Sequence, residues 1–274
     1  MSTNPLKQYF RRPAVYLKLP SGGKYYREGV INFPETGELP VYPMTAIDEI
    51  TTKTPDALFN GTAVSDLIKS CVPNIIDPWQ ISSTDMDAIL LAIKAASGTQ
   101  NLDIESICPS CKEAATYGLE LVAILSTLTA PDYSKPLEIG ELKLAFGPLT
   151  YKEMNQAAMS QFDIQRMFVN IDSIIDTKEK NEKTKEALIS ITGVTMEVIA
   201  KTIRVIETPN ATVDNYEFIL DFLQNCDKDA YISIRDYHTS LKAATELKPL
   251  DVKCSDCGHE YKQPFTINAS DFFG

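Results

Sequence analysis

The sequence contains few of the groups from which enzyme active sites are built. It has only two histidines among 274 residues, His238 and His259, although histidine is the side chain that most often serves as a general base near neutral pH. Gly22-Gly23-Lys24 lacks the G-x-x-x-x-G-K-[ST] spacing of a phosphate-binding loop, and no G-x-S-x-G nucleophile motif is present. We therefore expect no active site, and no enzyme activity, in this chain.

Long apolar stretches are also missing. One of the longest covers residues 119–128 (LELVAILSTL), where Glu120 and Ser126 interrupt it, so no segment approaches the ~20 apolar residues that a membrane span requires. The first seven residues (MSTNPLK) contain no apolar region of a signal peptide. We therefore expect synthesis and folding in a reducing cytoplasm, where paired cysteines favour metal binding over disulfides.

Positive charge is scarce as well. Lysine and arginine together number 26 against 37 aspartates and glutamates, which gives a formal net charge of −11. A protein that binds nucleic acid broadly needs a basic surface to neutralise phosphates, and this balance argues against such binding. Three basic residues near the N-terminus, Lys7, Arg11 and Arg12, are only a weak indication of a local basic patch.

Cysteine is the residue type with the most informative pattern. Two C-x-x-C motifs, Cys108-Pro-Ser-Cys111 and Cys254-Ser-Asp-Cys257, each stand between segments with the alternation of β-strands. Together they supply four thiolates, which complete the ligand shell of one tetrahedral Zn²⁺ site. A catalytic zinc site keeps one position open, so the pattern predicts a structural zinc ribbon.

Other uses of these cysteines stay open. Reduced thiols or disulfides are the main alternative, and iron is a less favoured metal than zinc. A c-type haem would need a histidine directly after the second cysteine, where Lys112 and Gly258 stand. His259 is a weak competitor as a ligand, because four thiolates already fill the shell. Cys71 and Cys226 lie in apolar helical patterns and are predicted to be buried as small hydrophobic residues.

The hydrophobic periodicity predicts an α+β protein with a distinctive order of parts. These parts are an N-terminal β-rich arm (residues 1–43), a helical segment (44–100), a zinc-ribbon-like β unit formed by two distant pieces (101–150 and 246–274), and a helical insertion between those pieces (151–245).

Several local features are predicted within these parts. Residues 25–31 are expected to form a strand, residues 137–146 a hairpin of the ribbon unit, and residues 196–206 a helix. Thr45-x-x-Asp48 predicts a helix capping box, with Asp in place of the usual Glu or Gln. The two phenylalanines at the C-terminus, Phe272 and Phe273, are expected to be docked, since free chain ends seldom expose two large aromatic side chains.

A series of segments precedes the first cysteine motif in a recognisable order. They are 16–26 (YLKLPSGGKYY), 41–50 (VYPMTAIDEI), 55–64 (PDALFNGTAV), 68–72 (IKSCV) and 85–93 (DMDAILLAI). This combination resembles the baseplate proteins of T-even-type contractile-tailed bacteriophages, a group that includes a baseplate hub subunit. The similarity is best over residues 14–150 and returns at 252–273, and the helical part between them is less distinctive.

The resemblance implies a structural or assembly protein of the phage tail baseplate, in the hub region, that docks neighbouring baseplate and tail proteins. It implies a symmetric hetero-oligomeric assembly, synthesis in the host bacterial cytoplasm, a final location in the virion, and no catalytic residues. Members vary in whether both cysteine pairs are present, so zinc stays a prediction from spacing.

A zinc-ribbon adaptor that binds nucleic acid or a transcription partner is the alternative function. Such an adaptor would need a basic surface around the cysteine motifs. The flanking charges are instead mostly acidic: four lysines (Lys112, Lys248, Lys253, Lys262) stand against six carboxylates (Glu105, Glu113, Glu246, Asp251, Asp256, Glu260).

Overall fold

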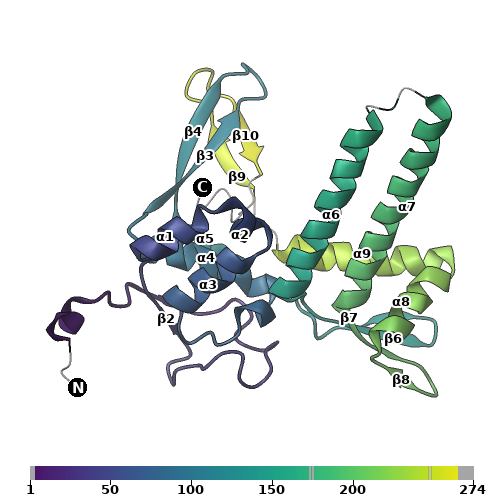
Figure 1. Cartoon of the computed structure of the whole chain (residues 1–274), viewed down its shortest axis with the longest axis horizontal. Coiled ribbons are helices and arrows are strands. Elements are labelled where there is room, and N and C mark those ends of the chain that lie inside the picture. Colours follow the sequence, from purple (N-terminus) through teal and green to yellow (C-terminus); the bar gives the residue numbers. More distant parts are fainter. Residues whose placement is uncertain (1–3, 173, 175, 246, 248, 265–274) are drawn as a thin grey trace. The chain divides into compact units, whose positions relative to one another are not determined.

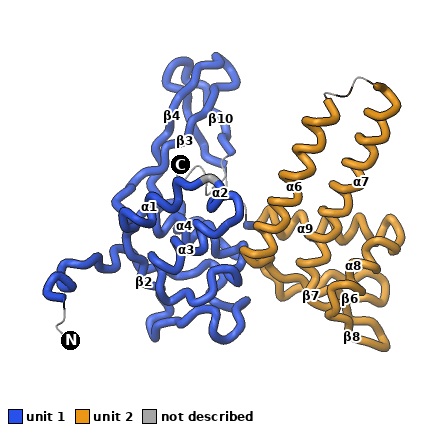
Figure 2. The backbone as a smooth tube through the Cα atoms, viewed as in Figure 1, with its two compact units in different colours: residues 1–130, 245–274 blue, residues 131–244 orange. Residues whose placement is uncertain are grey.

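The computed structural model describes residues 4–172, 174, 176–245, 247 and 249–264 (Figure 1). The chain forms two compact units, one from residues 1–130 with 245–274 and the other from residues 131–244 (Figure 2). Both contain helices and antiparallel strands, which confirms the α+β class. Within the described ranges, no helix is both long and apolar enough to cross a membrane. The prediction for Phe272 and Phe273 falls outside the described residues.

The first unit is built around helix α4 (Ser83–Ala96). This helix is buried on most sides, and Ile89, Leu91 and Ile93 are fully shielded from solvent, as expected for a helix in the middle of a small domain. The unit also contains α1 (Ala46–Thr52), α2 (Pro55–Phe59), α3 (Thr62–Cys71), α5 (Leu121–Thr127), the 3₁₀ turns η1 (Pro5–Tyr9) and η2 (Pro78–Gln80), and the strands β1 (Val15–Leu17) and β2 (Leu39–Val41).

The N-terminal part contains less sheet than the sequence predicted. Strands β1 and β2 pair antiparallel, but residues 25–31 form only a single bridge, between Ile31 and Ile75, so the strand predicted there was wrong. Tyr26 in this segment donates a hydrogen bond of 2.6 Å to Asp85 on α4. The segment is thus held by contacts to a helix in place of a strand ladder.

Asp85 connects the N-terminal loop to α4 through a buried network. Its carboxylate is fully buried and accepts hydrogen bonds from the Ser21 backbone N–H (2.8 Å) and from the hydroxyls of Ser21 (2.5 Å), Tyr26 (2.6 Å) and Ser82 (3.2 Å). A buried carboxylate is stable only when donors replace its lost water. The burial of Tyr26 and the negative charge of Asp85 both raise the pKa of the Tyr26 hydroxyl, which therefore stays a donor.

Helix α1 begins with the predicted capping box. The Thr45 hydroxyl accepts from the Asp48 backbone N–H (3.2 Å), and the Asp48 carboxylate accepts from the Thr45 backbone N–H (2.7 Å). The reciprocal pair satisfies donors that the first helical turn leaves without partners. The shorter Asp side chain therefore serves here in place of Glu or Gln.

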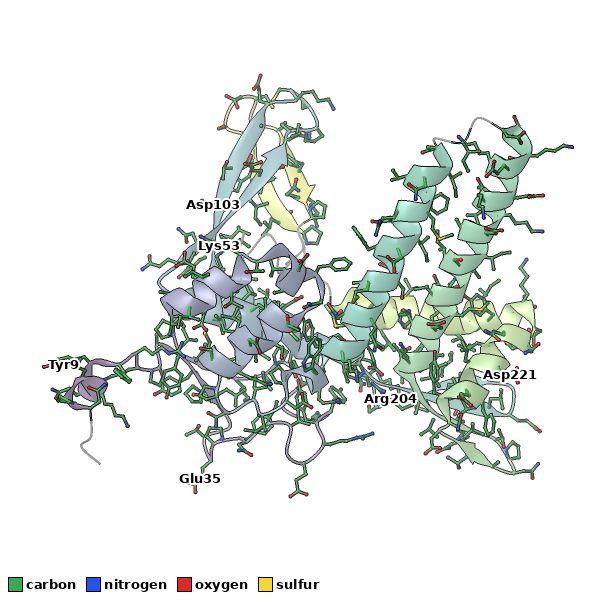
Figure 3. The ribbon with its side chains drawn as sticks, viewed as in Figure 1. Tyr9, Glu35, Lys53, Asp103, Arg204 and Asp221 are labelled. Atoms are coloured by element: carbon green, nitrogen blue, oxygen red, sulfur yellow. The ribbon has the colours of Figure 1, made fainter. Side chains whose placement is uncertain are left out.

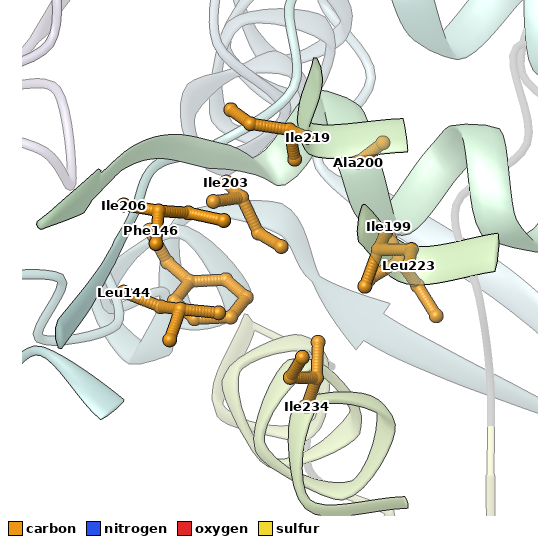
Figure 4. Packing of buried hydrophobic residues seen from close by; sticks show 9 residues of the cluster. All are labelled: Leu144, Phe146, Ile199, Ala200, Ile203, Ile206, Ile219, Leu223 and Ile234. Atoms are coloured by element: carbon orange, nitrogen blue, oxygen red, sulfur yellow. The ribbon is translucent and has the colours of Figure 1, made fainter. Parts of the chain in front are cut away.

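In its described residues, the second unit combines a four-stranded antiparallel sheet with four helices. The strand order is β5 (Leu137–Ile139), β6 (Leu142–Phe146), β7 (Ile203–Glu207) and β8 (Thr212–Val213). The helices are α6 (Tyr151–Asp172), α7 (Thr177–Thr202), α8 (Tyr216–Asn225) and α9 (Lys228–Thr245). Figure 4 shows the core between them, formed by Leu144, Phe146, Ile199, Ala200, Ile203, Ile206, Ile219, Leu223 and Ile234.

The sheet of the second unit corrects two local predictions. The helix predicted over residues 196–206 ends at Thr202, and residues 203–207 continue as β7, where β-branched side chains pair well with a neighbouring strand. The hairpin predicted over residues 137–146 forms, but its strand β6 pairs with β7 and not with a strand of the first unit.

Candidate metal centre

The two cysteine motifs lie at the turns of two antiparallel hairpins of the first unit. Strand β3 (Asn101–Ile107) pairs with β4 (Ala114–Glu120), and β9 (Leu250–Lys253) pairs with β10 (Glu260–Gln263). In each hairpin the C-x-x-C motif follows the first strand directly. Figure 1 shows the two hairpins side by side, and this arrangement brings the motifs together.

The two turns share one backbone geometry. In each, the N–H of the first cysteine donates to the carbonyl five residues later (2.9 Å), and its own carbonyl accepts from the N–H four residues later (3.0 Å). The residue after the second cysteine has a positive φ, 67° at Lys112 and 72° at Gly258. Glycine adopts this conformation freely, whereas a residue with a Cβ atom is strained in it.

The four sulfur atoms all lie within 4.8 Å of one another. The Sγ atoms of Cys108 and Cys257 are 3.7 Å apart, and those of Cys111 and Cys254 are 3.6 Å apart. Both distances are far longer than the ~2.05 Å of a disulfide bond, and none of the four cysteines forms a disulfide. The distances are close to the edge of about 3.8 Å expected for a tetrahedron with Zn–S bonds of ~2.3 Å. The four cysteines therefore lie close enough together to bind a metal ion.

The thiols influence one another's acidity. Hydrogen bonds from backbone N–H groups, first that of Cys111 and then that of Ser110, lower the pKa of the Cys108 thiol to about 6 against the effect of burial. For Cys111, the Glu113 N–H lowers the pKa, but burial and the other three thiols outweigh it and raise the pKa to about 12. One thiolate therefore forms readily, while further proton loss needs a compensating positive charge.

Polar side chains join the two hairpins beside the cysteines. The buried Ser106 hydroxyl of β3 lies 2.8 Å from the Tyr261 hydroxyl and donates to the Gln263 side-chain carbonyl at 2.5 Å. On the neighbouring strands, the Tyr117 hydroxyl donates to the Lys253 carbonyl at 3.2 Å. None of these residues was predicted from the sequence as part of the site. The spacing of two between Tyr261 and Gln263, which places both on one face of β10, was the available signal.

The other cysteines and the nearest histidine take no part in the cluster. Cys71 is fully buried on α3, as predicted, whereas Cys226 is only half-buried at the end of α8. His259 stacks on Tyr261, with ring centroids 6.0 Å apart and planes 14° from parallel. In the part of the chain that the structure describes, the four cysteines are the one group of three or more His, Cys, Asp or Glu side chains with a metal-binding arrangement.

Comparison with known proteins identifies one family. No curated protein and no solved structure matches the chain. The family described as T4 bacteriophage base plate protein matches residues 15–274, from the first residue of β1 to the last residue given and across both cysteine motifs. Because this match covers nearly all of the sequence, the chain belongs to the T4 bacteriophage base plate protein family, which has a structural role in the phage tail.

Proposed function

We propose that the chain is a structural or assembly component of the hub region of a contractile-tail base plate, and that its four clustered cysteines hold one structural Zn²⁺. One observation carries the proposal. Motifs separated in sequence by 143 residues between Cys111 and Cys254 place four Sγ atoms within 4.8 Å, in a member of a base plate family.

The donor set fits zinc. Four thiolates are soft ligands, which select Zn²⁺ or iron over the hard cations Mg²⁺ and Ca²⁺. Two C-x-x-C pairs at hairpin turns are the usual ligand spacing of structural zinc sites, which makes iron the second choice. Cys108, Cys111, Cys254 and Cys257 would together fill a tetrahedral shell. Such a shell leaves no position for a substrate, so the bound ion would crosslink the chain and supply no catalysis.

The two hairpins have little apolar core of their own, which supports a structural metal. In strands β3, β4, β9 and β10, only Ser106 and Val252 are buried. Isolated two-stranded hairpins are marginally stable in water, and small units of this kind depend on disulfides or metals. An ion bound to both turns would hold the hairpins in one orientation, which suits a surface on which neighbouring proteins dock.

The partners under this proposal are other hub and tail proteins, joined in a symmetric assembly that is built in the host bacterial cytoplasm. Nucleic acid is not expected among them. Lys253 on β9 is paired with Glu260 on β10 at 3.2 Å, and Glu105, Glu113 and Asp256 add negative charge around the turns. Phosphate groups bind where basic charge is in excess.

Quantitative mass spectrometry of purified phage particles tests the structural role. We expect the chain to be present in a fixed ratio to the major tail-tube protein, and the ratio then limits the symmetry of the assembly. Absence from particles, with abundance in the infected-cell lysate, would contradict a virion component and favour an assembly factor or the adaptor function.

Elemental analysis of the purified protein tests the metal. We expect one zinc ion per chain, measured by inductively coupled plasma mass spectrometry after exhaustive dialysis against metal-free buffer. A protein that carries iron, or that carries no metal and keeps its hairpins folded, would contradict the assignment.

A further inference from the structure

An apolar peptide precedes the part of the chain that matches the family. The N-terminal peptide (residues 4–12) includes the turn η1 and ends before residue 15, where the match begins. Its large side chains are exposed: Leu6 by 60%, Tyr9 by 77% and Phe10 by 57%. Figure 3 shows Tyr9 on η1, apart from the helices of the first unit. Apolar side chains gathered in this way on a surface mark an interaction site.

The same peptide is a basic segment of an acidic chain. It carries Lys7, Arg11 and Arg12 and no carboxylate, whereas the whole chain has a net charge of −11. The rest of the chain therefore carries −14. Like net charge opposes the association of two copies, and a basic segment at their contact offsets part of that repulsion.

Arg11 fixes the root of the N-terminal peptide to the first unit. Its guanidinium donates to the Pro43 carbonyl (2.6 Å) and to both the carbonyl and the hydroxyl of Ser70 (2.8 Å each). It also lies 3.4 Å from the carboxylate of Asp48 on α1. By contrast, η1 contains no buried residue. The peptide therefore has a fixed root next to α1 and an exposed end that carries the apolar side chains.

Helix α1 presents a surface that complements this peptide. Ile47 and Ile50 stand three residues apart, and hence on one face of the helix, and the two residues are 75% and 69% exposed. Asp56 at the start of α2 is exposed and adds negative charge beside this face, whereas the exposed carboxylate of Glu49 on α1 pairs with Lys53 at 3.4 Å. The peptide is rooted beside this face and yet leaves it uncovered within one chain.

We infer that the N-terminal peptide of one copy docks on the α1 face (Ile47 and Ile50) of a second copy. Each chain carries both surfaces, so a two-fold pair makes the contact twice. The five exposed apolar side chains offer on the order of 600 Å² in one contact. The reciprocal pair then buries about 1,200 Å², which lies in the range of specific protein interfaces.

Photo-crosslinking of the full-length, metal-loaded protein tests the contact directly. Tyr9 is replaced by p-benzoylphenylalanine in one preparation and Ile50 in another, and each is mixed with an equal amount of ¹⁵N-labelled unmodified chain before irradiation. We expect crosslinks from position 9 to α1, and from position 50 to the N-terminal peptide, in peptide pairs of mixed isotopic composition. Mixed pairs form only between two chains.

Matched substitutions test the energetics by sedimentation equilibrium. Tyr9→Ser, and Ile47→Ser combined with Ile50→Ser, should each raise the dissociation constant of the dimer at least tenfold. Lys7→Glu should also raise this constant and should remove its dependence on salt concentration. These side chains are exposed in the single chain, so the fold should persist. The control is Val122→Ser on α5, which removes a side chain of comparable exposure (61%) and should leave the constant unchanged.

Three results would overturn the inference. The first is a protein that stays monomeric at every concentration, with crosslinks only within one chain, since the peptide then folds onto its own α1. The second is a dimer whose dissociation constant is unaffected by Tyr9→Ser and by the paired isoleucine substitutions. The third is crosslinking of position 50 to any segment other than the N-terminal peptide of a second chain. The test needs no phage particle, so its failure leaves the proposed base plate role untouched.

Discussion

Replacing Cys254 by serine is the change that most directly tests a structural metal. A hydroxyl is a poor ligand for Zn²⁺ beside three thiolates, so Cys254→Ser should abolish tight zinc binding. Serine has nearly the same shape as cysteine, so the substitution introduces no steric clash into the pairing of β9 with β10. Any large effect on stability therefore reports the lost crosslink.

The size of the effect follows from the length of chain that the metal closes. Cys111 and Cys254 are 143 residues apart. Most of this loop is the second unit (residues 131–244), which keeps its fold when the crosslink is lost, so the loop outside that unit is residues 112–130 and 245–253, 28 residues. For a loop of that length the chain-entropy relation gives about 3.5 kcal/mol at 25 °C. Zinc-dependent peptides gain on the order of 10 kcal/mol from the ion as a whole, so 3.5 kcal/mol is a conservative expectation. A loss of this size is large for two hairpins whose strands contain two buried side chains.

The loss should stay local. The second unit has its own core of nine buried side chains, among them Phe146 and Ile234, and none of these contacts depends on the cysteines. Hydrogen exchange followed by mass spectrometry should therefore show loss of protection in β3, β4, β9 and β10, while β6, β7 and α8 keep theirs. Metal content, measured on the same sample, should fall from one zinc per chain to none.

Cys226→Ser is the matched control for this experiment. It makes the same chemical change at a half-buried thiol whose contact, to the Leu223 carbonyl at 3.7 Å, a serine hydroxyl can also make. We expect full zinc content and unchanged exchange. If Cys254→Ser kept full zinc content and an unchanged melting temperature, the four-cysteine site would be refuted. Parallel unfolding of the second unit would refute the argument that the loss is local.

Four further changes should alter stability in defined directions. Lys112→Gly should raise the free energy of unfolding of the zinc-loaded protein by about 1 kcal/mol, because it relieves a positive φ. Gly258→Ala should lower it by about 1 kcal/mol, through backbone strain alone, since no atom lies within 4 Å of the added Cβ. Asp85→Ala should cost about 3–5 kcal/mol in urea unfolding, because it leaves buried donors without an acceptor. Burial raises the pKa of Asp87 from its usual 3.8 to about 6, so the folded protein holds this proton more tightly than the unfolded chain. Stability should therefore fall as pH rises from about 4 to 6. Asp87→Asn should abolish that fall and add on the order of 2 kcal/mol at pH 7.

Each of these expectations has a clear contrary result. Because the two turns share one geometry, Lys112→Gly should stabilise the protein and Gly258→Ala should destabilise it by a similar amount. A stabilising Gly258→Ala would contradict the explanation by backbone strain. An Asp85→Ala protein as stable as the original would show that the network contributes nothing net. A flat dependence of stability on pH between 4 and 6, identical in the original and Asp87→Asn proteins, would place the Asp87 carboxyl in water.

Local chemistry made several features predictable from the sequence. The capping box at Thr45 and Asp48 depends on two residues three positions apart, and the strand alternation around each cysteine pair depends on neighbours only. The burial of Cys71 follows from its place on the apolar face of a helix. These features need no knowledge of distant residues, and the structure contains each of them.

Predictions failed where distant partners decided the outcome. Residues 203–207 have an apolar content that suits a helix or a strand, and pairing with β6 makes them a strand. Residues 25–31 have the alternation of a strand, but a single bridge at Ile31 is their whole strand pairing, and Tyr26 is bonded to Asp85 on α4. The hairpin at 137–146 was predicted as part of the ribbon unit, whereas its strand β6 pairs with β7, since pairing is a property of two segments.

The sequence by itself determined the mixed helix and strand content, the two cysteine pairs and the acidic charge, because each is written in residue type and spacing. Only the tertiary structure decided that Cys111 and Cys254, 143 residues apart, come within 3.6 Å of each other, and that Ser106, Tyr117, Tyr261 and Gln263 join the hairpins that carry them. Spacing along a chain limits which groups can act together locally, whereas the meeting of distant groups depends on the packing of everything between them.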